Sequence, residues 1–104
     1  MPNCLFCKII NKEIPANIEY EDDNYMVIHD INPKAKHHLL ILPKKHISMV
    51  SEITEKNKNI IADSVLLANQ TAKKLNSKGY KLLYNVGADG GQEIFHIHLH
   101  LMGY

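Results

Sequence analysis

Short apolar runs separated by turn-forming residues predict that the first half of this chain forms strands. Residues 18–21 and 25–29 flank the turn-forming residues 22–24, which predicts a hairpin that stops at Asn32-Pro33. The run His37–Pro43 is almost continuously apolar and ends in a proline, as expected for a central strand buried on both faces. We therefore expect three strands here, the third in the middle of a sheet.

The second half changes to a helical period and then returns to strands. Between about residues 54 and 75, apolar residues recur at intervals of three and four, and Gly79 supplies a stop signal. Residues 80–87 and 93–102 then predict two strands joined by the glycine-containing loop ADGGQ. The order predicts one α+β domain over residues 1–104, with an antiparallel sheet of about five strands and one main helix on one face.

Three histidines alternate with apolar residues in the last predicted strand. Side chains two positions apart in a strand share a face at spacings of about 6.5 Å, so His96, His98 and His100 would form a row. The apolar residues between and after them would pack against the main helix and fix this register. A single histidine is most often an ordinary core or surface residue, whereas three in a row favour a function.

Two functional interpretations of the row remain open from the residues alone. Alternating histidines can ligate zinc, although three ligands along a straight strand do not all converge on one tetrahedral ion, so a pair with a distant ligand fits better. Alternatively, a neutral imidazole attacks phosphorus while its neighbours fix its tautomer and deliver a proton. The adjacent loop ADGGQE would then offer backbone N–H groups to phosphoryl oxygens.

The composition restricts the partners. The formal charge is +1 and all twelve basic residues are lysines, so neither a field that recruits nucleic-acid polymers nor an arginine clamp for phosphate is expected. No apolar run approaches the roughly 18 to 20 residues that cross a bilayer, and the first residues lack the pattern of a signal peptide, so we expect no membrane partner and a cytoplasmic protein. Because 104 residues bury only a small core, stabilisation by a metal or a partner subunit is expected.

The two cysteines, Cys4 and Cys7, lie in Cys-x-x-Cys spacing, which in a reducing compartment indicates metal ligation or redox work more than a structural disulfide. With two further ligands they would hold zinc, and His46 and His96 are the candidates. A reduced pair without metal and a redox pair are the alternatives, although no thioredoxin-like strand–helix context surrounds the motif. If His96 binds zinc, we expect a structural ion and no cofactor for catalysis, so that chelation lowers the melting temperature but leaves the rest of the histidine row in place.

The pattern His-φ-His-φ-His-φ-φ from His96 to Met102 resembles the signature of the histidine triad (HIT) superfamily of nucleotide hydrolases and transferases. Three earlier blocks, LFCKIINKEIPANIEYEDD, HDINPKAKHHLLILPKKHIS and NSKGYKLLYNVGADGGQE, are similar in order and spacing to the branch of small nucleoside phosphoramidate hydrolases, the HINT type, so the resemblance covers nearly the whole chain. It implies a HIT fold and a homodimer whose sheets join across the interface. Related bacterial-type proteins with an N-terminal Cys-x-x-Cys are similar in binding zinc.

The implied activity is hydrolysis of the P–N bond between a purine nucleoside monophosphate and an amine, through a covalent nucleotidyl-histidine. His98 matches the nucleophile, His100 the group that assists the leaving group, and His38 a fourth histidine that hydrogen-bonds into the triad, with His96 as a support. A dinucleoside polyphosphate hydrolase of the same superfamily is the alternative enzyme. A nucleotide-binding interaction module with little catalysis is the alternative from another class.

The resemblance also implies the residues that contact the nucleotide. Asp30 matches a carboxylate that binds the ribose hydroxyls, although an Asp before a turn is equally often a cap. Asn85 matches a contact to phosphate or ribose. The remaining candidates are Gly91, Gln92 and Glu93 near the phosphate, and Phe6, Ile14, Ile28, Ile31 and Leu40 around the base. Glu93 stands where eukaryotic relatives have a serine, and since an ionised carboxylate cannot donate a hydrogen bond, only its backbone N–H is expected to serve.

Overall fold

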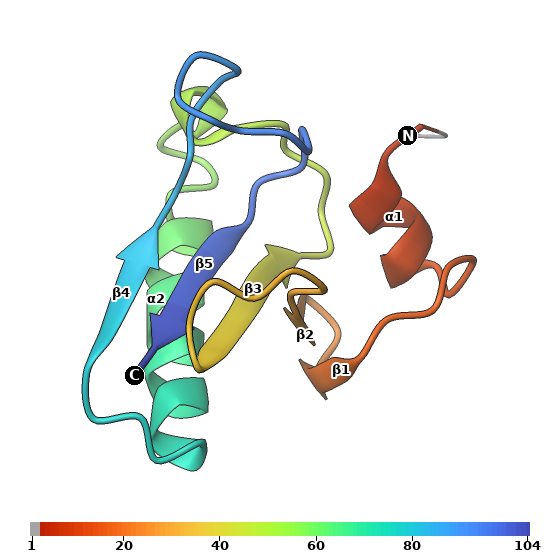
Figure 1. Cartoon of the computed structure of the whole chain (residues 1–104). Coiled ribbons are helices and arrows are strands. Elements are labelled where there is room, and N and C mark those ends of the chain that lie inside the picture. Colours follow the sequence, from red (N-terminus) through yellow and green to blue (C-terminus); the bar gives the residue numbers. More distant parts are fainter. Residues whose placement is uncertain (1–2) are drawn as a thin grey trace.

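An antiparallel sheet in the strand order β1-β2-β3-β5-β4 forms the centre of the fold (Figure 1), as described for residues 3–104 by a computed structural model. The elements in chain order are α1 (Leu5–Ile10), β1 (Ile18–Glu21), β2 (Tyr25–His29), β3 (His37–Pro43), the 3-10 helix η1 (Val50–Glu52), α2 (Asn59–Lys74), β4 (Tyr80–Leu83) and β5 (Leu99–Gly103). The predicted α+β class, the five strands and the main helix on one face are confirmed.

The hairpin β1–β2 and the strand β3 have the predicted bounds. Asp22 closes the hairpin turn, since its carboxylate accepts the backbone N–H groups of Asn24 and Tyr25. β3 pairs with β2 on one side and β5 on the other, with Leu40 opposite both Ile28 and His100. The prediction of a central, doubly buried strand is therefore confirmed.

Alternation along β3 gives the sheet two different faces. Its residues Leu39 and Ile41 join the core under α2, together with Leu99 and Leu101 of β5. Its residue Leu40 lies in a second apolar cluster, which α1 covers. His38 and His100 are on this second face, because they are even-numbered positions of the same two strands and their rings meet.

The last strand is shorter than predicted and does not contain the whole histidine row. β5 begins at Leu99, so His96 and His98 precede it and only His100 belongs to the ladder. The preceding segment is held differently, because Ile97 N–H donates to the Ile47 carbonyl at 2.7 Å and the His96 ring is used elsewhere. A period of two in sequence therefore did not produce a continuous strand.

Three other boundaries also differ from the prediction. β4 ends at Leu83 instead of continuing to residue 87, where Gly87 has a φ of +77° that breaks an extended strand. α2 begins at Asn59 instead of near residue 54, because the Asn57 side chain accepts the Thr54 N–H and forms a separate turn. The helix α1 was not predicted, since six residues are too few for a helical period.

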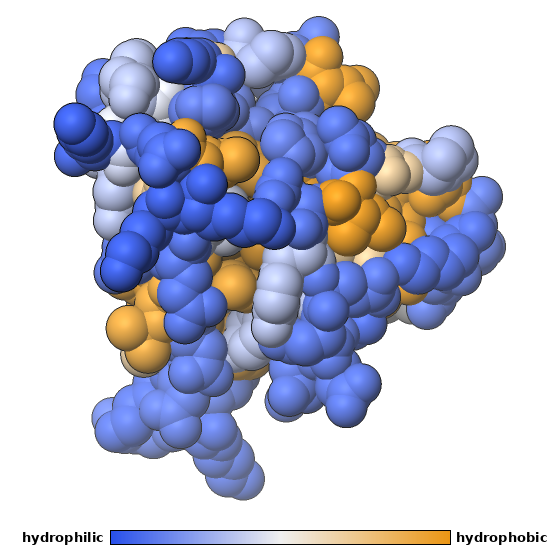
Figure 2. Space-filling model, turned by 90° about the horizontal axis from the view of Figure 1, so that it is seen from below, coloured by the Kyte–Doolittle hydropathy of each residue, from blue (hydrophilic) through white to orange (hydrophobic). Residues whose placement is uncertain are grey.

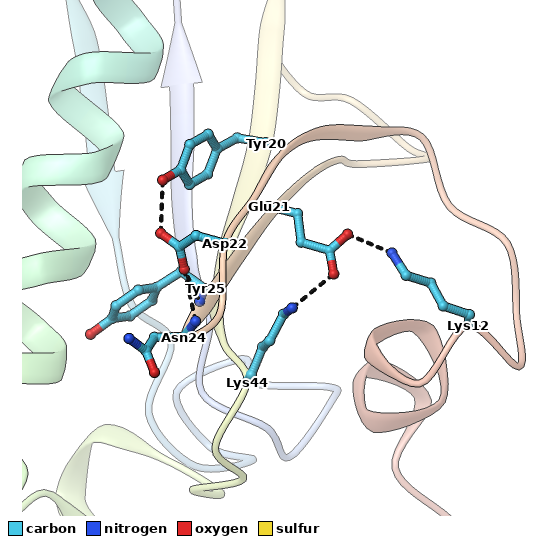
Figure 3. Close-up of polar contacts among 7 residues, drawn as sticks. All are labelled: Lys12, Tyr20, Glu21, Asp22, Asn24, Tyr25 and Lys44. Carbon is cyan, nitrogen blue, oxygen red and sulfur yellow. Dashed lines mark hydrogen bonds and ion pairs between the residues drawn. The ribbon is translucent and has the colours of Figure 1, made fainter.

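Side-chain contacts begin α1 and connect it to the sheet. The Cys4 sulfur caps the helix by accepting the Cys7 N–H at 3.3 Å. After the helix, Lys12 forms an ion pair with Glu21 of β1, and the same carboxylate pairs with Lys44, which follows β3 (Figure 3). These contacts place both cysteines near the end of β3.

Hydrophobic residues on the surface lie in separate patches among hydrophilic ones on the face seen in Figure 2. The sheet edge at β4 exposes Leu82 and Leu83 by 37% and 43%, whereas the opposite edge, β1, carries Glu19 and Glu21 beside its apolar residues. Among residues 3–104, no helix is both long enough and apolar enough to cross a membrane.

Candidate functional site

Hydrogen bonds fix which ring nitrogen of His98 carries its proton. Nδ1 lies 2.7 Å from the His96 carbonyl oxygen, which only accepts, so Nδ1–H is the donor. Burial lowers the pKa of His98, so the ring is neutral near pH 7 and Nε2 keeps its lone pair. A neutral imidazole with an oriented lone pair is the form that attacks an electrophile.

A second chain of hydrogen bonds fixes the protons of His38 and His100. The backbone N–H of Lys34 donates to His38 Nδ1 at 3.0 Å, so the proton of His38 is on Nε2. That Nε2–H lies 3.0 Å from His100 Nδ1 and donates to it. Burial first, and then the charges of His98 and His38, lower the pKa of His100 to about 4, so neutral His100 carries its proton on Nε2. The rings of His98 and His100 are adjacent, with centroids 4.9 Å apart. The site therefore contains one acceptor nitrogen, Nε2 of His98, and one donor nitrogen, Nε2 of His100.

Asp30 combines the two roles considered for it. One carboxylate oxygen accepts the Asn32 N–H at 2.8 Å and caps the turn after β2, while the other lies 3.5 Å from His38 Nε2. We call Asp30, His38, His98 and His100 the histidine cluster. Asp30, His38 and His100 have possible ligand atoms within 4.8 Å of one another. The proton on His38 Nε2, however, leaves that nitrogen no lone pair for a metal.

Apolar residues adjoin the histidine cluster as predicted for a base pocket, with one exception. Phe6 packs edge-on against His98, with centroids 5.0 Å apart, and is buried. Three other predicted residues share its apolar cluster on this face, namely Ile14, Ile28 and Leu40. Ile31 does not, because it is 91% exposed at the turn after β2.

The structure corrects the prediction for Gln92. Its amide oxygen accepts the Gly87 N–H at 2.9 Å, and its amide nitrogen donates to the carbonyls of Ser48 and Ile94 at 2.7 and 3.0 Å. The backbone N–H of Gln92 is also used, by the Gly87 carbonyl. Gln92 is therefore a positioning residue that ties the glycine loop to the segment after β3, with no hydrogen left for phosphate.

The predicted anion-binding loop is likewise occupied by its own turn. The N–H groups of Gly90 and Gly91 donate to the carbonyls of Gly87 and Ala88, so these backbone groups do not point to a ligand. A side chain at Gly90 would approach the Val86 carbonyl oxygen to 2.5 Å, which explains the glycine there. Asn85 and Gly91, both predicted as contacts, do lie together, since a Cβ on Gly91 would be 3.6 Å from the Asn85 amide oxygen.

Glu93 lies beside a different part of the molecule from the histidine cluster. It lines a hollow of about 520 Å³ together with Ile94 and Phe95 on its own segment, Asn3, Cys4 and Leu5 at the N-terminal side, and His46. None of His38, His98 and His100 lines this hollow. Glu93 therefore borders a hollow beside Cys4 and His46 that none of these three histidines lines.

Cys4, Cys7, His46 and His96 form the other cluster of candidate ligands, the cysteine–histidine cluster. All four ligand atoms lie within 4.8 Å of one another. His96 Nδ1 is 3.5 Å from each cysteine sulfur and 3.1 Å from His46 Nδ1, which is 3.3 Å from the Cys7 sulfur. For tetrahedral zinc with bonds of about 2.1 Å to nitrogen and 2.3 Å to sulfur, N···N is about 3.4 Å and S···N is about 3.6 Å, so the observed separations of 3.1 to 3.5 Å are close to those of a zinc site.

The chemistry of the donors also fits a zinc ion. The Nε2–H of His96 donates to the Pro43 carbonyl at 2.8 Å, and burial lowers the pKa of His96 to about 4, so neutral Nδ1 presents its lone pair to the cysteines. Such a carbonyl partner is typical of a metal-bound histidine. Burial, followed by the neighbouring Cys4, raises the pKa of the Cys7 thiol to about 11, and a divalent cation is what would keep both sulfurs ionised.

The sequence indicated histidine and cysteine side chains that the structure places close together, but it did not indicate the backbone groups that orient them. The Lys34 N–H, the Pro43 carbonyl and the His96 carbonyl each fix one histidine tautomer. No residue type signals such a role, because every residue has these groups. The helical context of Cys-x-x-Cys did have a signal, since this spacing suits an N-cap and its partner three residues later.

Comparison with known proteins gives matches over nearly the whole chain. Residues 3–104 match the family described as "Scavenger mRNA decapping enzyme C-term binding". The chain is 42% identical over 104 residues to Protein HitA of Neisseria gonorrhoeae, covering 99% of this chain and 97% of that one.

Solved structures agree with these matches. A HIT family hydrolase from Clostridium thermocellum has a TM-score of 0.97 and 48% identity, covering 100% of this chain and 92% of that one. A zinc-bound histidine triad family protein from Mycobacterium smegmatis has a TM-score of 0.85 and 31% identity, covering 98% and 75%. On the sequence match over nearly the whole chain and on the fold, the chain belongs to the histidine triad (HIT) family.

Proposed function

We propose that this protein hydrolyses purine nucleoside phosphoramidates, in which the phosphate of a nucleoside monophosphate is joined to an amine through a P–N bond. The observation that carries the proposal is the complementary pair of tautomers in the histidine cluster. His98 has an unprotonated Nε2, and the neighbouring His100 has a protonated Nε2. Attack on phosphorus and protonation of the leaving amine require this combination.

The proposed reaction has two steps. His98 Nε2 forms a bond to phosphorus as the P–N bond to the amine breaks, and His100 Nε2–H gives its proton to the leaving nitrogen. Water then attacks the phosphorus of the nucleotidyl-histidine, gives a proton back to His100 and releases the nucleoside monophosphate and free His98. Throughout, His38 holds His100 in the donor tautomer and the His96 carbonyl stabilises the positive charge on His98.

Substrate contacts follow from where the residues lie. We assign the base to the apolar face beside Phe6, Ile14, Ile28 and Leu40, and the ribose hydroxyls to the carboxylate oxygen of Asp30 that is not used by the turn. Asn85, beside Gly91, is the proposed side-chain contact to the phosphate or ribose. Ile31 is exposed at the same turn as Asp30, and we expect its side chain to become buried only when a base packs against it.

Dinucleoside polyphosphates are a second candidate substrate class, favoured by the loop before β3. Lys34 is exposed, and its charge contributes to lowering the pKa of His100, so it lies near the proposed leaving-group side. A cation there would favour an anionic leaving group over an amine. Turnover of a nucleoside monophosphate amide compared with a diadenosine polyphosphate, repeated in Lys34→Gln, distinguishes the two classes.

The assembly and setting complete the proposal. Zinc at the cysteine–histidine cluster would stabilise the fold and is given no chemical step. A homodimer is proposed through the β4 edge, because this edge strand exposes leucines and has no acidic residue, whereas β1 carries two glutamates beside its own exposed apolar residues. A reducing cytoplasm suits a chain with two free cysteines.

The experiment that tests the function is a substrate panel on the wild type and His98→Ala, with intact-mass detection of the enzyme. We expect a nucleotidyl adduct on the wild type and an activity loss of at least about 10³-fold in the variant, as for removal of other nucleophiles. His29→Gln is the control, since His29 contacts Glu19 outside the histidine cluster. No adduct and no turnover with any substrate in the wild type would leave the binding-module alternative, and unchanged turnover in His98→Ala would exclude His98 as the nucleophile.

A further inference from the structure

His96 takes part in both clusters, through different groups. Its ring points Nδ1 to Cys4, Cys7 and His46, while its backbone carbonyl accepts the Nδ1–H of His98 at 2.7 Å. The residue is fully buried, so the packing around it leaves its ring little room to turn independently of the backbone. A change in how the ring is held is therefore passed on to the carbonyl that fixes the His98 tautomer.

We propose that metal occupancy of the cysteine–histidine cluster holds His98 in its Nδ1–H tautomer through the His96 carbonyl. His96 is thus a positioning residue, and the ion acts at a distance without contacting substrate. This inference departs from the expectation that chelation leaves the nucleophile in place. The effect of the ion on the His98 tautomer does not depend on the proposed function, whereas its effect on turnover rests on that function.

The segment that carries His96 and His98 has little other support. It precedes β5, so it lacks the paired ladder of a sheet strand. It is hydrogen-bonded instead by the Ile97 N–H to the Ile47 carbonyl after β3 and by the His96 Nε2–H to the carbonyl of Pro43 at the end of β3. Without a cation, two imidazole nitrogens only 3.1 Å apart share at most one proton, so their separation is then poorly fixed.

A second contact runs from the same cluster to His98 through α1. Phe6 lies between the two cysteines in sequence and touches both rings edge-on, with centroids 6.0 Å from His96 and 5.0 Å from His98. An ion bound by Cys4 and Cys7 would fix the turn of helix that carries Phe6. The carbonyl of His96 and the ring of Phe6 therefore both reach His98, one from a candidate ligand and the other from the residue between two of them.

The other half of the histidine cluster supplies an internal reference. His38 and His100 lie on β3 and β5, where paired backbone hydrogen bonds hold their rings together. The Lys34 N–H that fixes His38 belongs to the loop before β3. Metal removal should therefore disturb His98 selectively, while the His38–His100 pair keeps its protons where they are.

The test reads the ring protons directly by two-bond ¹H–¹⁵N correlation spectra of protein labelled at histidine, with one equivalent of zinc and after chelation. In the zinc form we expect a single His98 tautomer with its proton on Nδ1. In the chelated form we expect a second tautomer at a comparable population and at least about ten-fold faster exchange of this proton, with His38 and His100 unchanged. Identical His98 signals in both forms would overturn the proposal.

Two variants keep the test decisive if chelation unfolds the chain. With zinc present, His46→Cys retains four ligands and should keep the single His98 tautomer. His46→Gln retains three ligands and should show the second His98 tautomer as well. His29→Gln is the control, because His29 lies outside both clusters. Equal tautomers in the two His46 variants, with the metal content different, would refute the coupling. In turnover assays, His46→Gln should lower kcat about ten-fold with KM little changed, as for partners that orient metal ligands. A failure of turnover in the wild type would refute the proposed function and leave the spectra interpretable.

Discussion

The two clusters of this protein contain similar side chains but are held together in different ways. In the histidine cluster, His38 and His100 stand on adjacent strands whose register puts Leu39 opposite Leu101 and His38 opposite Met102. In the cysteine–histidine cluster, the ligands come from a short helix, a loop after β3 and the segment before β5. Regular pairing positions His38 and His100, whereas the second group meets where a short helix and two irregular segments come together.

The difference shows which part of the site depends on the folded sheet and which depends on a ligand. Backbone ladders are formed by every sequence that folds this way, so the His38–His100 contact needs no further component. The ligand atoms of the cysteine–histidine cluster lie close enough together to hold a metal ion, which would supply the attraction that joins them. Removing a bound ion should therefore affect this cluster and His98, whereas perturbing the sheet should affect the His38–His100 pair.

The largest effect should come from removing core support for the sheet. Leu101 is 1% exposed and packs under α2 beside His100, so Leu101→Ala should lower the free energy of unfolding by about 2 to 5 kcal/mol, measured by urea denaturation. Leu5→Ala, at a residue that is 41% exposed, is the matched control and should cost less than about 1 kcal/mol. Equal losses in the two variants would contradict this assignment of the core.

Removal of the cation should have the next largest effect. With free zinc at 100 times its dissociation constant, binding to the folded chain alone contributes about 2.7 kcal/mol. Chelation should then lower the melting temperature by about 10 °C or more, because 1 kcal/mol corresponds to about 4 to 8 °C in a domain of this size. Cys7→Ser should remove the response to zinc, and an unchanged melting temperature in protein shown to bind zinc would contradict the stabilising role.

Sequence reasoning succeeded for the sheet because strand periodicity and burial act locally. The apolar run of β3 predicted a central strand, and the family resemblance, not the apolar pattern, indicated His38 as the histidine that bonds to the row; the structure places it beside His100. Sequence reasoning failed at residues 93–98, where the same alternation continues although the backbone leaves the sheet. The cause is tertiary, since the His96 ring is directed to the Pro43 carbonyl and the cysteines, and a period of two contains no information about such partners.

Acid should weaken the histidine cluster in a defined direction. Burial lowers the pKa of His100 from 6.5 to about 4. Between these two pH values, His100 is therefore protonated in the unfolded chain and neutral in the folded chain. This contribution to stability is complete above pH 6.5 and is lost as the pH falls towards 4. Urea denaturation at pH 7 and pH 4.5 should show a smaller decrease in His100→Asn than in the wild type. An equal decrease in the two proteins would exclude His100 as a source of the pH dependence.

The smallest effect should come from the ion pairs that connect α1 to the sheet. Glu21 is paired with Lys12 after α1 and with Lys44 after β3 (Figure 3), and these pairings lower the pKa of its carboxyl. Because the three groups are exposed to solvent and salt, Glu21→Gln should weaken zinc binding only slightly, through looser placement of the helix that carries Cys7. The difference from the wild type should disappear at high salt, which screens the pairs, whereas the His38–His100 signals should be the same at both salt concentrations. A salt-independent loss of zinc affinity would mean that Glu21 supports the cysteine–histidine cluster by something other than charge. A change in the His38 and His100 signals would mean that this pair is not held independently of the cysteine–histidine cluster.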